Sequence, residues 1–127
     1  MTDSAAPSGR RPRILVAEDE FLVATMLQQM LEDLGFDCAG PCGNLPQALA
    51  VARVEPLDGA IVDLHIVEAD AAPLVEMLIE RNIPVGLSTG LSADGDLNPV
   101  HHALPRMMKP FTIEDVRALL IELGFSF

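Results

Sequence analysis

The stretch Gly-Ala-Ile-Val-Asp-Leu-His-Ile at residues 59–66 decides the fold, because it joins a continuous apolar run to a carboxylate. The run over residues 60–62 does not alternate with polar side chains, which is typical of a strand buried on both faces of a parallel sheet. Asp63 follows directly, and a carboxylate is costly to bury unless it is paired or has a chemical task. The stretch therefore predicts a central strand with a functional acid at its end.

Four further short apolar runs predict strands, at residues 14–17, 36–40, 83–88 and 106–108. Between and after the strands, apolar residues recur at helical spacing and predict helices with inward-facing stripes that include Met26 and Ile79. These helical patterns cover residues 23–34, 45–52, 74–79 and 113–123, and a weak fourth helix is expected within residues 90–104. Five strands that alternate with five helices predict an α/β domain whose parallel sheet is covered on both sides.

Local signals mark several helix ends. Asn44 is expected to cap the second helix, and Thr112 with Asp115 three residues later resembles a capping box for the last one. Gly35 and Asn82 fit the C-termini of the first and third helices. The apolar end at residues 123–127 predicts either an extension of the last helix into a dimer face or packing against the sheet.

Length and composition restrict the class of protein. The 127 residues accommodate one domain, expected over residues 13–127 after a polar, disordered leader at residues 1–12. The leader lacks the apolar segment of a secretory signal, and no apolar run approaches the length of a membrane span. We therefore expect a cytoplasmic protein with no membrane partner.

The formal net charge of −11 argues against nucleic-acid binding, which needs a cationic face. Cys38 and Cys42 are too few, without nearby histidines, to form a zinc site, and we expect reduced thiols with no chemical role.

Polar side chains follow four of the predicted strands at the point where each strand ends. Glu18 and Asp19 follow the first strand, Asp63 the third, Thr89 the fourth and Lys109 the fifth. Because the carboxyl ends of parallel strands meet at one edge, these side chains are expected to converge there. Taken singly, each has an ordinary interpretation, such as a helix-dipole partner, a turn residue or a surface charge.

Three converging carboxylates repel one another unless a cation lies among them, and Mg²⁺ prefers oxygen ligands. Asp63 would then be a nucleophile that forms an acyl phosphate. Lys109 and the metal would screen the phosphoryl charge, and the Thr89 hydroxyl would donate to it.

The chain resembles the receiver domains of bacterial two-component response regulators from about Arg13 onward. Four stretches carry the resemblance, in the family's order: ILVAEDE at 14–20, AIVDLHI at 60–66, IPVGLSTG at 83–90 and MMKPF at 107–111. The resemblance implies a flavodoxin-like, doubly wound (βα)5 fold with a five-stranded parallel sheet of order 2-1-3-4-5. It also implies a phosphorylation-dependent signalling switch.

The resemblance assigns a role to each site residue. It implies that Asp63 is the phosphoacceptor, Asp19 the main Mg²⁺-binding acid and Glu18 a second acid that reaches the metal through water. The backbone carbonyl of His65 would complete the metal ligands.

It further implies that Thr89 is the switch hydroxyl and Lys109 the family's lysine, with Lys109–Pro110 as a cis peptide. Such a domain catalyses its own phosphorylation and slow dephosphorylation but is not a metabolic enzyme.

The family also implies partners. A histidine kinase or histidine phosphotransfer protein would contact the start of the first helix, at Phe21 and Leu22, and the loop at Pro110 and Phe111. A downstream protein or a second copy of the chain would bind the face formed by the fourth helix, fifth strand and fifth helix. No output domain is expected after residue 127, so the domain would signal through protein contacts, relay phosphoryl groups or act as a phosphate sink.

Some positions depart from the family pattern. Arg106 stands where the family often has the aromatic residue that swings inward on activation. Pro73 and the stretch at residues 87–90 partly match a group of stand-alone receivers from alphaproteobacteria. His65 and Leu91 occupy positions that tune the lifetime of the acyl phosphate in the family.

Two other functions remain open at this point. The first is a phosphorylation-independent interaction module of the same fold, which Arg106 favours and the retained site residues oppose. The second is an aspartate-nucleophile phosphatase, which would need a second acid at the position of His65 and is disfavoured for that reason.

Overall fold

The central sheet has five strands, all of them parallel, in a computed structural model that describes residues 10–66, 69–90 and 103–127. The strands are β1 (Arg13–Ala17), β2 (Asp37–Cys42), β3 (Gly59–Asp63), β6 (Val85–Thr89) and β7 (Arg106–Met108). Their order across the sheet is β2-β1-β3-β6-β7, which is 2-1-3-4-5 when these five are counted along the chain. The predicted fold class and strand order are confirmed.

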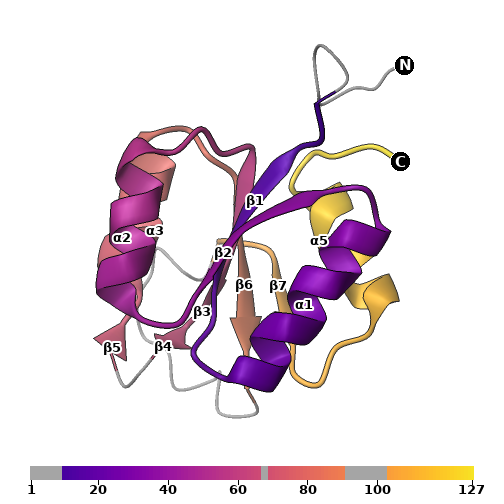
Figure 1. The fold of residues 1–127 in the computed structure, drawn as a ribbon, viewed down its shortest axis with the longest axis horizontal. Coiled ribbons are helices and arrows are strands. Elements are labelled where there is room, and N and C mark those ends of the chain that lie inside the picture. The colour runs from indigo at the N-terminus through magenta and orange to yellow at the C-terminus, as the bar shows by residue number, and fades with distance from the viewer. Residues whose placement is uncertain (1–9, 67–68, 91–102) are drawn as a thin grey trace.

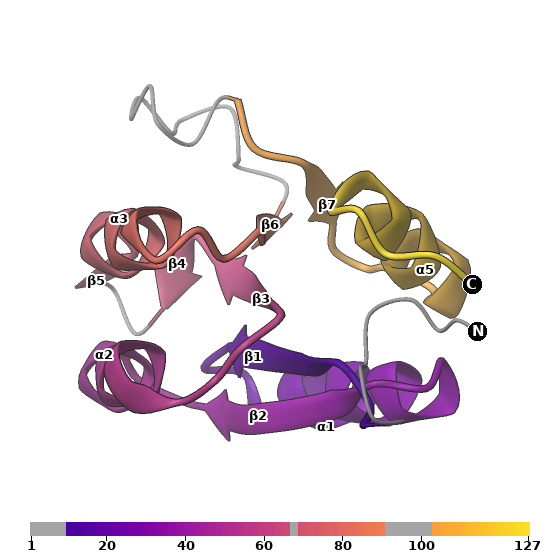
Figure 2. The same ribbon diagram turned by 90° about the horizontal axis from the view of Figure 1, so that it is seen from above.

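Helices cover both faces of this sheet. The helices α2 (Leu45–Val54) and α3 (Ala72–Glu80) lie on one side, and α1 (Phe21–Asp33) and α5 (Ile113–Glu122) lie on the other (Figures 1 and 2). The predicted fourth helix falls largely on residues 91–102, outside the described residues. Among the described residues, no helix is long and apolar enough to cross a membrane.

The two layers have separate apolar cores because successive strand residues point to opposite faces. On β1, Leu15 packs with the core under α2 and α3, whereas Ile14 and Val16 pack with the core under α1 and α5. Gly86 on β6 faces α5, where a Cβ atom would lie only 2.9 Å from the Leu119 side chain. A glycine at this position therefore allows α5 to approach the sheet closely.

The predicted helix caps are present. The Asn44 side chain accepts a hydrogen bond from the Gln47 amide at 2.9 Å. Thr112 and Asp115 form both hydrogen bonds of a capping box at the start of α5. Asn82 follows α3 with a φ of 60°, and Gly35 follows α1 with a φ of 97°. These left-handed conformations at helix C-termini suit glycine and asparagine.

Some sequence predictions are wrong in detail. Met26 and Ile79 were expected to face inward, but their side chains are 47% and 43% exposed, because each lies at the margin of its helix's apolar stripe. The second strand continues to Cys42 through Pro41. An edge strand tolerates proline, which has no N–H to donate, because one side of the strand has no neighbouring strand to pair with.

A two-stranded antiparallel ribbon follows β3 and was not predicted. It consists of β4 (His65–Ile66) and β5 (Ala69–Asp70), with His65 opposite Asp70. Strands of two residues are too short to produce a recognisable alternation in the sequence.

The C-terminal residues pack against the domain instead of extending the last helix, which ends at Glu122. Phe125 is buried and meets Phe36 edge to face, with ring centroids 5.2 Å apart. The Arg117 guanidinium lies 4.9 Å from the centroid of the Phe127 ring, a cation–π distance. Of the two possibilities for residues 123–127, packing within the domain is the one observed.

Candidate functional site

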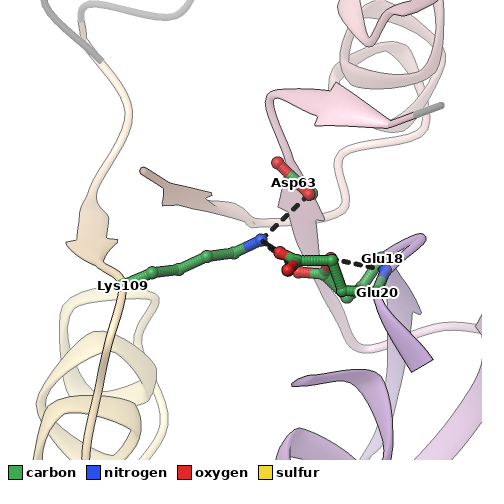
Figure 3. A network of polar contacts seen from close by, with 4 residues as sticks. All are labelled: Glu18, Glu20, Asp63 and Lys109. Atoms are coloured by element: carbon green, nitrogen blue, oxygen red, sulfur yellow. Dashed lines mark hydrogen bonds and ion pairs between the residues drawn. The ribbon is translucent and has the colours of Figure 1, made fainter. Parts of the chain in front are cut away.

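Charged side chains from three strand ends meet at the carboxyl edge of the sheet (Figure 3). The Nζ atom of Lys109, just after β7, lies 3.1 Å from Oδ2 of Asp63 at the end of β3. The same nitrogen lies 2.9 Å from Oε1 of Glu18, the residue after β1. The topology thus brings together three of the residues that the sequence placed at successive strand ends.

A fourth member, Glu20, was missed in the sequence. Its Oε1 atom lies 2.8 Å from Lys109 Nζ, so one ammonium contacts three carboxylates (Figure 3). Glu20 is the N-cap residue of α1, yet its side chain makes no capping hydrogen bond. The triplet of acids at residues 18–20 was the available signal, but an acid at a helix start is commonly explained by the helix dipole alone.

Glu18 is held in a buried position. Its side chain is 2% exposed, and its Oε2 atom accepts a hydrogen bond from the Glu20 amide at 3.0 Å. Burial raises the pKa of Glu18 to about 7, and the charge of Asp63 adds to this effect, while the contact with Lys109 opposes it. Near neutral pH, a fraction of the Glu18 side chains is therefore protonated.

Lys109 is fixed by its backbone as well as by its ammonium. Its amide donates to the Thr89 carbonyl at 2.7 Å, and the Lys109–Pro110 peptide is cis, as expected. Burial by itself would lower the pKa of Lys109, but contacts with Glu20, Glu18 and Asp63 outweigh it and raise the pKa above its usual value. The lysine is therefore a permanent cation in this site.

The hydroxyl groups of Ser88 and Thr89 are buried at the end of β6 and have no hydrogen-bond partner among the described residues. These residues pair with the neighbouring strands, Ser88 with Asp63 on β3 and Thr89 with Met108 on β7. A buried hydroxyl without a partner is destabilising, which calls for an explanation in terms of a ligand or a change of state.

Carboxylate oxygens of Glu18, Glu20 and Asp63 lie within 4.8 Å of one another, a spacing that could hold a metal ion. Hard oxygen ligands of this type suit Mg²⁺. Asp19, expected to be the main metal-binding acid, is exposed and is not a member of this group. His65 lies in β4, two residues after Asp63, so its backbone is close to the site along the chain.

Next to the cluster is a groove of about 410 Å³ whose charged lining residues are Glu20 and Lys109. The rest of its lining comes from the first half of α1 and from the loops after β6 and β7: Val23, Met26, Gly90, Pro110 and Phe111. Phe21 and Leu22, at the start of α1, are 78% and 76% exposed. Pro110 is exposed, but Phe111 is buried in the core under α1 and α5.

Arg106 is half-buried on β7, at the edge of the sheet. With Met108, Asp115 and Glu122 it lines a second groove, of about 340 Å³. Leu91, the other position that departs from the family pattern near the site, lies outside the described residues.

Comparison with solved structures decides the family. The chain is 33% identical to SdrG from Sphingomonas melonis Fr1, with a TM-score of 0.81 over 91% of this chain and 98% of that one. A response regulator receiver protein from Sinorhizobium medicae WSM419 has the same fold, with a TM-score of 0.76 at 21% identity over 91% of this chain and 96% of that one. This chain belongs to the response regulator receiver domains.

A further solved structure with the same fold is described with a bound metal ion. The receiver domain of the sensor histidine kinase PA1611 from Pseudomonas aeruginosa PAO1 is described with a magnesium ion in its active-site cleft; it is 22% identical, with a TM-score of 0.78 over 91% of this chain and all of that one.

The transcriptional regulatory protein PdtaR of Mycobacterium tuberculosis is 27% identical over 117 residues, 90% of this chain. The receiver domain covers only 55% of PdtaR, so it spans about half the length of this relative. No protein-family model matches the chain.

Proposed function

We propose that this receiver domain, over residues 13–127, accepts a phosphoryl group on Asp63 from a histidine kinase or a histidine phosphotransfer protein. The receiver family supports a phosphorylation-dependent role in two-component signalling. The observation that carries the finer proposal is the position of the Asp63 carboxylate, at the end of a buried strand and 3.1 Å from a lysine ammonium. In the cytoplasm the domain would act as a switch, a relay or a phosphate sink.

The transfer requires little rearrangement of covalent bonds. An Asp63 carboxylate oxygen attacks the phosphorus of a phosphohistidine, an O–P bond forms, and the P–N bond breaks with its electron pair left on the imidazole. Lys109 stabilises the charge that develops on the phosphoryl oxygens, and the Thr89 hydroxyl donates to one of them. Dephosphorylation is a separate step, in which water attacks the phosphorus of the acyl phosphate, the O–P bond to Asp63 breaks, and a carboxylate and inorganic phosphate are released.

The donor set at the site fits Mg²⁺, because it consists of carboxylates with oxygens close together. Glu18 and Asp63 belong to that cluster. We propose that they hold this ion together with Asp19 and the backbone carbonyl of His65. When bound, the ion would neutralise charge on the phosphoryl oxygens. The lysine alone leaves three carboxylates undercompensated, which favours the binding of a divalent cation.

The two buried hydroxyls suggest how phosphorylation would be sensed. Thr89 has no hydrogen-bond partner among the described residues, so a phosphoryl oxygen on Asp63 would offer it one. The resulting movement would reach β7 and Arg106, which replaces the aromatic residue often found there. A downstream partner or a second copy of the chain would read this face, while the kinase would contact Phe21, Leu22 and Pro110.

The test is the intact mass of the protein after incubation with acetyl phosphate and Mg²⁺. We expect a gain of one phosphoryl group, absent in Asp63→Asn and absent when a chelator is added first. If neither acetyl phosphate nor a cognate kinase phosphorylates the wild type, the proposal is wrong, and a phosphorylation-independent interaction module becomes the better description.

A further inference from the structure

The Lys109 ammonium has three N–H donors and lies within contact distance of three carboxylates, at 2.8, 2.9 and 3.1 Å. Two of these contacts, to Glu20 and Asp63, are hydrogen bonds, and the third, to Glu18, is an ion pair, so one positive charge faces three carboxylates in the unphosphorylated protein. If phosphoryl oxygens on Asp63 are to contact Lys109, they compete for this one positive charge with the carboxylates that already lie against it.

The three carboxylates differ in how readily they can leave. The side chains of Glu18 and Asp63 are only 2% and 7% exposed, so moving either away from the lysine would leave a buried charge without its partner. The Glu20 side chain is 62% exposed, and water can solvate its carboxylate as soon as the contact breaks. Exposed ion pairs of this kind contribute little free energy, so Glu20 is the partner that Lys109 loses most easily.

The position of Glu20 also places it in the path of a phosphoryl group. Glu20 and Lys109 are the two charged residues that line the groove next to the site. A phosphoryl group bound to Asp63 carries close to two negative charges and would lie near the same ammonium that Glu20 contacts. The two anions would repel each other, because one lysine cannot compensate both.

We propose that Glu20 is a displaceable anion that occupies Lys109 in the unphosphorylated state and opposes entry of the phosphoryl group. This inference rests on the proposed function, since it concerns the same Asp63 site. Glu20 would act as a positioning residue that holds Lys109 in place and makes phosphorylation less favourable, so that the resting protein remains in its inactive state. A phosphodonor or kinase would have to release Glu20 to the solvent.

The test compares Glu20→Gln with a control that removes the same charge elsewhere. Glu80→Gln serves as that control, because Glu80 is an exposed residue at the C-terminal end of α3, a helix that contributes no residue to the site. We expect Glu20→Gln to raise the rate of phosphorylation by acetyl phosphate about three-fold, the factor that corresponds to the free energy of an exposed ion pair. Glu80→Gln should leave the rate unchanged.

A binding measurement separates this role from a structural one. Beryllofluoride, a stable stand-in for the phosphoryl group, should bind Glu20→Gln about three-fold more tightly than the wild type at saturating Mg²⁺. Salt should narrow the difference between variant and wild type, because it screens the repulsion from Glu20.

An unchanged or lower affinity for beryllofluoride in Glu20→Gln would overturn the inference. A weaker affinity of Glu20→Gln for Mg²⁺ would also overturn it, because Glu20 would then be a metal ligand. If the wild type neither gains a phosphoryl group nor binds beryllofluoride, the proposed function itself fails. If wild type and Glu20→Gln respond equally, only the role of Glu20 is wrong.

Discussion

The two edges of the sheet carry similar kinds of charge in opposite arrangements. At the amino edge, three ion pairs that are at least partly exposed to solvent each join one arginine to one carboxylate: Arg10–Asp58 at 3.6 Å, Arg11–Asp37 at 3.8 Å and Arg13–Glu55 at 2.6 Å. At the carboxyl edge, one lysine serves three carboxylates, two of which are buried. Charge is therefore balanced where it faces water and unbalanced where it is shielded from water.

The difference agrees with the function that we propose for the carboxyl edge. Exposed pairs are screened by solvent and need no exact balance, yet they are balanced. Buried carboxylates in excess destabilise the fold, yet they are retained at the carboxyl edge. The proposed binding of a cation and a phosphoryl group would give this site a reason to keep the excess, whereas a purely structural cluster would have none.

Removal of the central cation should give the largest effect on stability. We expect Lys109→Met to lower the free energy of unfolding by about 3 kcal/mol at about pH 8, because Glu18 and Asp63 would remain buried without a counter-charge. Urea denaturation measures this loss. The matched change at the other edge, Arg11→Met, should cost at most about 1 kcal/mol, and equal losses in the two variants would remove the distinction between the edges.

The pH dependence of stability should identify Glu18. Because its pKa is about 7 in the folded protein and 4.5 in the reference state, the folded protein binds the extra proton between these values. Glu18 therefore destabilises the folded protein, and this destabilisation increases by on the order of 3 kcal/mol as pH rises from about 4.5 to about 7.

In Glu18→Gln, this decline between the two pH values should be absent, and the variant should be more stable than the wild type at about pH 8. Thermal denaturation at a series of pH values measures both. A wild-type stability that rises over this pH range would contradict the pKa inferred for Glu18. The neighbouring charges of Asp63, Glu20 and Lys109 would then account for the rise.

Magnesium should act on one edge only. We expect about 10 mM Mg²⁺ to stabilise the wild type by one to two kcal/mol, roughly as expected for a ligand present at ten or more times its dissociation constant. The shift should disappear in Asp63→Asn and persist in Arg13→Gln. Stabilisation that survives in Asp63→Asn would mean that the ion binds elsewhere.

The smallest effect is expected at the amino edge. Arg13→Gln removes the 2.6 Å contact with Glu55 and should cost about 0.5 kcal/mol at low salt. The loss should vanish at about 0.5 M NaCl, where charges are screened over a few ångströms. In contrast, the effect of Lys109→Met should survive the same salt, because its partners are shielded from solvent. A salt-independent loss in Arg13→Gln would show that this pair is not an ordinary surface pair.

The amino-acid sequence by itself determined the alternation of strands and helices, the parallel sheet and the caps at Asn44 and Thr112. Each of these depends on residues near in the chain, whose spacing and side-chain chemistry are visible in the sequence. The sequence also predicted that acids and a lysine would follow the strands that end at one edge.

Only the tertiary structure decided how these residues meet. The contact between Glu20 and Lys109 joins residues that lie 89 positions apart, and no local pattern reveals that two of the three adjacent acids, Glu18 and Glu20, turn toward the lysine. The raised pKa of Glu18 likewise depends on burial by distant segments rather than on its neighbours in the chain. Exposure of Met26 and Ile79 depends on where each helix rests on the sheet. Long-range packing sets distances and solvent access, and these decide the chemistry of a charged group.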